Sequence, residues 1–107
     1  MRKINHERDP VQVLIWNIYQ DQYDKIAKMC LDGKSYSEVI RRIVDDAIEQ
    51  KLDESFYPKK QTSRSLKKIQ INITKKQYEW FILKFPGRKK AEGLRYIIDS
   101  YYEKRGM

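Results

Sequence analysis

Polar side chains that can form hydrogen bonds alternate with isoleucines between Lys68 and Thr74. Successive side chains of a strand point to opposite faces, so Lys68, Gln70 and Asn72 share one face and the isoleucines share the other. The two carboxamides offer a paired donor and acceptor, and the lysine offers donors only. This set matches the edge of adenine and the acceptors of guanine in the major groove of DNA. The alternative is that these residues form the hydrated side of an ordinary two-layer sheet.

A second alternating segment lies earlier in the chain, in residues 11–19. Its outward face keeps one amide, Asn17, but has Val13 and Ile15 where the later strand has a lysine and a glutamine. Such aliphatic side chains either contact the methyl groups of thymine or pack against another protein surface. The sequence leaves both interpretations open, and we expect this strand to contribute less to binding.

The two strands begin two copies of one sequence pattern, residues 11–49 and 66–103. At a shift of 55 residues, Asn17-Ile18 and Gln22-Tyr23 recur in the second copy. At a shift of 54 residues, six further residues recur: Gly33, Glu38, Arg41, Ile43, Asp45 and Glu49. Such self-similarity indicates a structural repeat in which a single copy cannot bury its own apolar face.

Each copy changes from alternation to helical spacing, which predicts one strand followed by two helices. The first helix of each copy has apolar residues at i, i+3, i+4 and i+7, namely Tyr23, Ile26, Ala27 and Cys30, then Tyr78, Phe81, Ile82 and Phe85. The second helices have apolar faces of the same kind, namely Val39, Ile40, Ile43, Val44, Ala47 and Ile48, then Leu94, Ile97, Ile98, Tyr101 and Tyr102. Trp80 and Tyr96 fall outside these faces, so we expect them to be exposed or to contact another subunit.

We therefore predict a mostly α-helical fold with a short two-stranded antiparallel β-ribbon, built from two strand-helix-helix copies in one chain. Residues 11–50 form the first copy, residues 66–105 form the second, and the polar segment 51–65 links them. The inward faces of the two copies are expected to form one shared core. The sequence leaves open whether each copy pairs instead with a second chain, which would give a dimer or a longer assembly.

Positive charge is concentrated in the second half of the chain. Residues 1–54 hold 9 Lys/Arg against 11 Asp/Glu, a net charge of −2, whereas residues 55–107 hold 14 against 4, a net charge of +10. The whole chain has a formal charge of +8 and a pI near 9.6. This asymmetry favours nucleic acid as the partner over an acidic membrane surface.

Cations also surround the expected start of the second helix in each copy. Gly33-Lys34-Ser35 and Gly87-Arg88-Lys89-Lys90 place backbone N–H groups beside positive side chains. The N-terminus of a helix attracts anions, so these segments are candidate binding sites for DNA phosphates. Basic residues before each strand, Arg64 among them, are candidates for further phosphate contacts.

Composition argues against several other functional classes of protein. One histidine and one cysteine cannot form a metal site, and no pair of carboxylates, nucleophile with a base, or glycine loop for phosphates points to an enzyme. Unbroken apolar runs such as Val13 to Trp16 are far too short to span a membrane. We expect no cofactor, no small-molecule substrate and no membrane partner, and a soluble cytoplasmic protein.

The strand from Lys68 to Thr74 has the form basic-apolar-polar-apolar-polar-apolar-Thr, and two amphipathic helices with a glycine turn follow it. This pattern resembles the ribbon-helix-helix family of DNA-binding proteins, which includes the Arc and MetJ repressors. The resemblance covers both copies. The chain is in this respect similar to tandem transcriptional regulators of archaeal viruses, which would place the protein in the host cytoplasm. It implies that the two strands pair antiparallel and read bases, and that the second helix of each copy holds a phosphate. The implied function is transcriptional regulation through double-stranded DNA, more often repression than activation in this family.

Three other functions remain open on sequence grounds. A non-specific architectural protein that coats DNA fits the charge equally well. An antitoxin-type autoregulator would normally add a toxin-binding tail, whereas this chain ends close to its last expected helix. A protein-binding scaffold would explain Val13 and Ile15 but not the basic second half.

Overall fold

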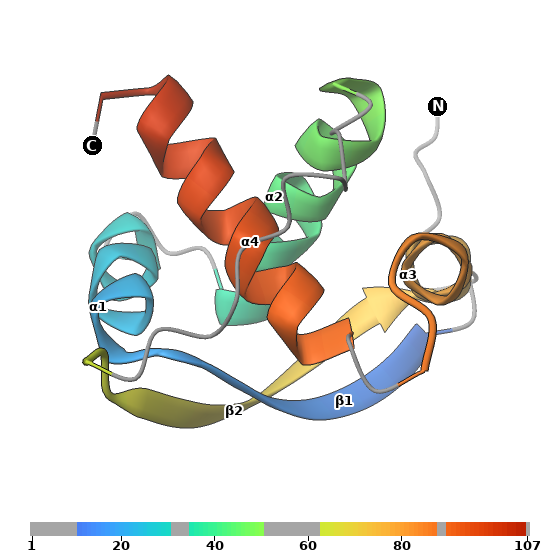
Figure 1. The fold of residues 1–107 in the computed structure, drawn as a ribbon, viewed down its shortest axis with the longest axis horizontal. Helices are drawn as coiled ribbons and strands as arrows, with labels where there is room; N and C mark the ends of the chain where they lie inside the picture. Colours follow the sequence, from blue (N-terminus) through green and yellow to red (C-terminus); the bar gives the residue numbers. More distant parts are fainter. Residues whose placement is uncertain (1–10, 31–34, 51–62, 88–89, 107) are drawn as a thin grey trace.

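The structure is a computed structural model, and it describes residues 11–30, 35–50, 63–87 and 90–106. The elements in chain order are β1 (Val11–Tyr19), α1 (Gln20–Met29), α2 (Tyr36–Gln50), β2 (Leu66–Thr74), α3 (Lys75–Lys84) and α4 (Lys90–Lys104). Figure 1 shows these helices on one side of the ribbon that β1 and β2 form. The predicted class, mostly helical with a two-stranded antiparallel ribbon, is confirmed.

The ribbon has a register that is symmetric about its middle. The two strands are antiparallel, and Ile15 lies opposite Gln70 at the centre of the nine pairs. Val13 pairs with Asn72 on one side of the centre, and Asn17 pairs with Lys68 on the other. The polar residues of β2 therefore share a face with the outward residues of β1, because the period of both strands is two.

The core lies between the inner face of the ribbon and the helices. Ile18, Ile69, Ile71 and Ile73 are buried there, and Leu14 and Trp16 pack against the same cluster from β1. The helices add residues that are all at most 5% exposed: Ile26, Val39, Ile40, Ile43, Val44, Ala47, Phe81, Phe85, Leu94, Ile97, Ile98, Tyr101 and Tyr102. The predicted apolar faces of α2 and α4 are thus confirmed, except that Ile48 is only partly buried.

Side-chain caps form at the starts of two helices. The Thr74 hydroxyl accepts a hydrogen bond from the Gln77 N–H at 3.1 Å at the start of α3. Before α2, the Ser35 hydroxyl accepts from the Glu38 N–H at 3.1 Å, and the Glu38 carboxylate accepts from the Ser35 N–H at 3.0 Å. These three contacts satisfy N–H groups at the helix starts that have no partner within the helix.

The buried face of α3 differs from the prediction. Its most buried residues follow steps of four, from Gln77 to Phe81 and on to Phe85 beyond the helix end, and this line leaves Ile82 43% exposed. Trp80 lies beside the line and contacts Phe81 and Phe85 edge-on, with ring centroids 5.3 and 5.9 Å apart. The expectation that Ile82 is buried is therefore wrong.

Trp80 and Tyr96 were expected to lie outside the buried faces. Both are partly buried and pack against the core cluster, so the expectation that they lie off the buried faces is wrong, and their contact with another subunit stays a prediction. The large rings reach the core from positions that flank the apolar stripe, because a long aromatic side chain covers more of the helix surface than its spacing alone indicates.

Candidate nucleic-acid interface

The outer face of the ribbon collects all six candidate base-reading residues. Lys68, Gln70 and Asn72 of β2 and Val13, Ile15 and Asn17 of β1 are all exposed and form three cross-strand pairs. The two aliphatic side chains are each 59% exposed. In Figure 1 the helices lie on the opposite side of β1 and β2. The structure thus brings these residues together on a surface that no described element covers.

The size of this surface suits a groove of double-stranded DNA. The outer two pairs lie four positions apart along each strand, a distance of about 13 Å at the usual rise of a strand. Neighbouring strands are about 4.8 Å apart, and the major groove is about 12 Å wide, so a two-stranded ribbon can enter it.

Both asparagines of the ribbon are held through their backbone. Arg41 of α2 donates from Nη1 to the carbonyl oxygen of Asn72 at 2.9 Å, and Arg95 of α4 donates in the same way to Asn17 at 2.8 Å. The N–H of Asn72 also donates to the Ser37 hydroxyl at 2.9 Å. An edge strand offers unpaired backbone groups, so these contacts fix the ribbon edge beside the two amide side chains.

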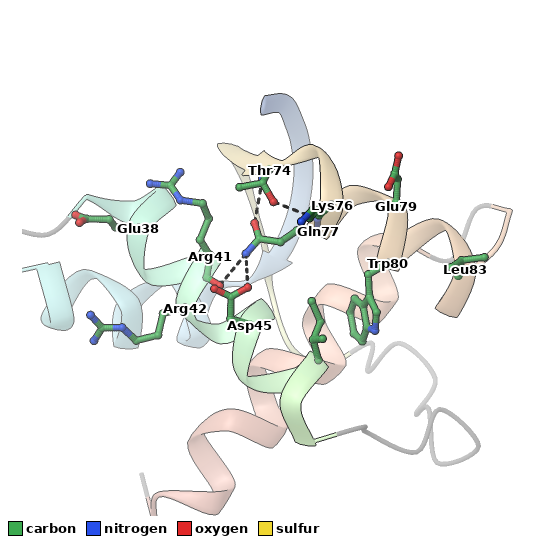
Figure 2. A pocket seen from close by; sticks show the side chains of 11 residues that line it. Glu38, Arg41, Arg42, Asp45, Thr74, Lys76, Gln77, Glu79, Trp80 and Leu83 are labelled. Carbon is green, nitrogen blue, oxygen red and sulfur yellow. Dashed lines mark hydrogen bonds between the residues drawn. The ribbon is translucent and has the colours of Figure 1, made fainter. Parts of the chain in front are cut away.

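Two buried glutamines join the ribbon to the helices at equivalent places. Figure 2 shows Gln77, whose Oε1 accepts from the Thr74 N–H at 3.0 Å, while its Nε2 donates to the Arg41 carbonyl at 3.1 Å and to Asp45 Oδ1 at 2.8 Å. The two contacts of Nε2 cross from the start of α3 to α2. The amide of Gln77 therefore ties the end of β2 to the helix whose Arg41 holds the ribbon edge.

Gln22 makes the same three contacts at the other end of the ribbon. Its Oε1 accepts from the Tyr19 N–H at 3.0 Å, and its Nε2 donates to the Arg95 carbonyl and to Asp99 Oδ1, both at 2.8 Å. The side chains of Gln22 and Gln77 are 1% and 4% exposed. Buried amides of this kind are stable only when their donors and acceptors are satisfied, which these contacts achieve.

Arg64 lies just before β2 and binds protein groups. Its guanidinium forms ion pairs with Asp21 at 2.7 Å and with Asp99 at 2.9 Å, and it stacks over the Tyr19 ring at 3.9 Å from the centroid. The hydrogen bond to Asp99 raises the pKa of Arg64 above its usual value. Arg64 is thus committed to joining β2 to α1 and α4, and its predicted contact with a phosphate is not supported by this arrangement.

Two of the five candidate phosphate-binding residues lie in the described part of the chain. Ser35 precedes α2, and Lys90 is the first residue of α4, where its Nζ donates to the Gly87 carbonyl at 2.9 Å. Both helices begin beside the ribbon and run away from it (Figure 1). Lys34, Arg88 and Lys89 fall outside the described residues.

A groove of about 820 Å³ runs between α2 and α3, away from the outer face of the ribbon. Figure 2 shows charged side chains of α2, such as Arg42 and Asp45, on one wall and Trp80 and Leu83 of α3 on the other. Leu83 is 80% exposed. The apolar end of α3 is thus a second surface with the capacity to contact a macromolecule.

The spacing of apolar residues did not reveal the polar contacts beneath the ribbon. Gln22, Gln77, Arg41 and Arg95 are not part of any apolar stripe. The sequence did carry a signal for them, because glutamine recurs at a shift of 55 residues and arginine at a shift of 54. Each recurring glutamine and arginine makes the same kind of contact as its equivalent in the other copy.

Comparisons of this chain with protein-family models, with curated proteins and with solved structures found no match.

Proposed function

We propose that the chain is a tandem ribbon-helix-helix protein that binds double-stranded DNA sequence-specifically and regulates transcription, acting as a repressor. The repeat is supported by the element order, in which a strand and two helices occur twice. It is supported further by the matched contacts of Gln22 and Gln77 and of Arg41 and Arg95, each of which crosses between the copies. Each copy thereby completes the hydrogen bonding of the other.

The observation that carries the proposal is the composition of the outer ribbon face. Gln70 and Asn72 expose amides that match adenine, and Lys68 exposes a donor that matches the acceptors of guanine. A surface that served only solubility would not require its backbone to be anchored. The contacts of Arg41 and Arg95 anchor the backbones of Asn72 and Asn17, and a fixed backbone has less conformational entropy to lose when the side chains bind.

Charge supports the same proposal. The half of the chain that contains β2 has a net charge of +10, and α3 begins with Lys75 and Lys76 directly after the ribbon. Phosphate neutralisation supplies most of the affinity that is independent of sequence, and base contacts then select the site.

The test replaces single amides on the ribbon. Gln70→Ala or Asn72→Ala should weaken binding to the preferred duplex by about 1–3 kcal/mol and relax base choice there, because each amide makes a paired contact with one base. Affinity for unrelated DNA should hardly change. Gln50→Ala, an exposed amide at the end of α2, is the matched control. An unchanged ratio of specific to non-specific affinity in both ribbon variants would show that β2 does not read bases.

Cooperative, non-specific coating of DNA is a second candidate function. It is favoured by the exposed apolar residues Ile82 and Leu83 on α3, which offer a surface for contact between adjacent molecules. A nuclease footprint separates the two functions. A short protected sequence supports a regulator, and uniform protection that spreads with protein concentration supports coating.

A further inference from the structure

The two strands are symmetric in register but not in the side chains that they expose. The register places Ile15 opposite Gln70, and these two residues are also equivalent in the repeat at a shift of 55. A pseudo-two-fold axis therefore passes through the centre of the ribbon. The same shift relates Asn17 to Asn72, which lie on opposite sides of that axis.

The asparagines preserve the symmetry of the reading surface. Each is exposed, and each has its carbonyl oxygen held by an arginine from the second helix of the other copy, at 2.8 Å for Asn17 and 2.9 Å for Asn72. The two ends of the ribbon thus present the same amide side chain on a backbone whose carbonyl oxygen is held in the same way. Such a pair calls for the same base at both ends of the site.

The remaining outward positions break the symmetry. Val13 is equivalent to Lys68, and Ile15 is equivalent to Gln70. In both cases the axis relates an aliphatic side chain to a polar one. Lysine donates to the acceptors of guanine, whereas a branched aliphatic group contacts the methyl of thymine and has no donor or acceptor. The end of the ribbon with Val13 and Asn72 is therefore suited to A·T pairs. The end with Asn17 and Lys68 is suited to a half-site that contains both an A·T and a G·C pair.

We propose that the chain recognises a non-palindromic DNA site and binds it in one orientation. The site has an adenine at each end, contacted by Asn17 and Asn72, and its two halves differ between these adenines. The outer pairs are about 13 Å apart, which corresponds to about four base pairs at 3.4 Å each. This inference rests on the proposed function, and it adds the symmetry and composition of the preferred duplex.

The test compares three proteins in selection from a random-sequence duplex library. The parent is compared with Val13→Lys/Ile15→Gln, which makes β1 match β2, and with Lys68→Val/Gln70→Ile, which makes β2 match β1. All four positions are on the exposed face, so the variants should melt within a few degrees of the parent, as circular dichroism would show. The expected result is a non-palindromic consensus for the parent and a different palindrome for each variant, one built from each half of the parent site.

A competition assay gives the same comparison as numbers. The parent should bind its selected duplex about tenfold more tightly than a palindrome made from either half, because one base contact is lost in each palindrome. The Val13→Lys/Ile15→Gln variant should instead bind the palindrome made from the guanine-containing half more tightly than the duplex that the parent selects.

A palindromic consensus for the parent would overturn the inference and leave the proposed function standing. The same follows if the parent and both variants select one unchanged consensus, because the outward residues would then not decide the sequence. Enrichment of no sequence at all, with uniform binding of the library, would overturn the sequence-specific function and this inference together.

Discussion

At the scale of residues, the buried glutamines distinguish this fold from a purely apolar core. Gln77→Ala should lower the free energy of unfolding by about 2–3 kcal/mol, because the Thr74 N–H, the Arg41 carbonyl and the Asp45 carboxylate all lose a partner. Gln70→Ala, at an exposed position, should change it by less than about 0.5 kcal/mol. Urea unfolding measures both. Equal effects would show that the Gln77 contacts contribute nothing to stability.

The exposed residues of the ribbon were predictable from local spacing, and the buried polar residues were not. Alternation with a period of two assigns each strand residue to a face, so the outward positions of Val13, Ile15 and Asn17 follow directly from their spacing. Arg95 is 7% exposed although arginine is usually at the surface. Its burial depends on the carbonyl of Asn17, a partner 78 positions away in the sequence, and no local pattern encodes that contact.

At the scale of elements, β1 spans the residues 11–19 that alternation predicted, and α3 shows the limit of helical spacing. The stripe from Tyr78 to Phe85 predicted the correct helix but the wrong side for Ile82. The Thr74 cap and the Gln77 contacts set the rotation of α3 about its axis. A polar contact therefore decided which apolar side chains became buried.

The close packing of α3 against α4 can be tested at a glycine. An added Cβ at Gly93 would lie 2.4 Å from a ring carbon of Phe85, so the ring must move. Gly93→Ala should therefore destabilise the protein by about 1–3 kcal/mol through overpacking, although alanine favours helices.

The matched variant removes the cause of the clash. The double variant Phe85→Leu/Gly93→Ala should lose less stability than the sum of the two single variants, and thermal melts of all four proteins measure this coupling. Strict additivity would mean that the ring does not contact Gly93 tightly enough to oppose a methyl group.

The two ends of α4 allow the proposed phosphate contact to be tested. Lys90 lies at the N-terminal end beside the ribbon, whereas Lys104 lies at the far end, where it pairs with Asp46 at 2.9 Å. Lys90→Ala should lower the salt slope of DNA binding by about one unit, because one fewer phosphate is neutralised. Lys104→Ala should leave the slope unchanged. If the two variants change the salt slope alike, the phosphate contact is not at the start of α4.

At the scale of the whole molecule, the sequence left open whether the copies pair within one chain. The structure pairs β1 with β2 of the same chain and places Trp16 of β1 edge-on to Phe81 of α3, with ring centroids 5.3 Å apart. No helix among the described residues is long and apolar enough to cross a membrane. The repeat itself could not decide the pairing, because two copies of one pattern can pair within a chain or between two chains.

The two tryptophans report on this shared core from different copies. Trp16 belongs to the first and Trp80 to the second, and both pack on the Phe81 ring. Trp80→Phe leaves Trp16 as the only tryptophan, and Trp16→Phe leaves Trp80, so tryptophan fluorescence reports on one copy in each variant. In each variant, urea unfolding followed by fluorescence should coincide with unfolding followed by circular dichroism, because one core unfolds in one step. The midpoints should also stay constant over a hundredfold range of protein concentration. Separate transitions would mean that the copies fold independently. A midpoint that rises with concentration would mean that the copies pair between chains, since association then contributes to stability.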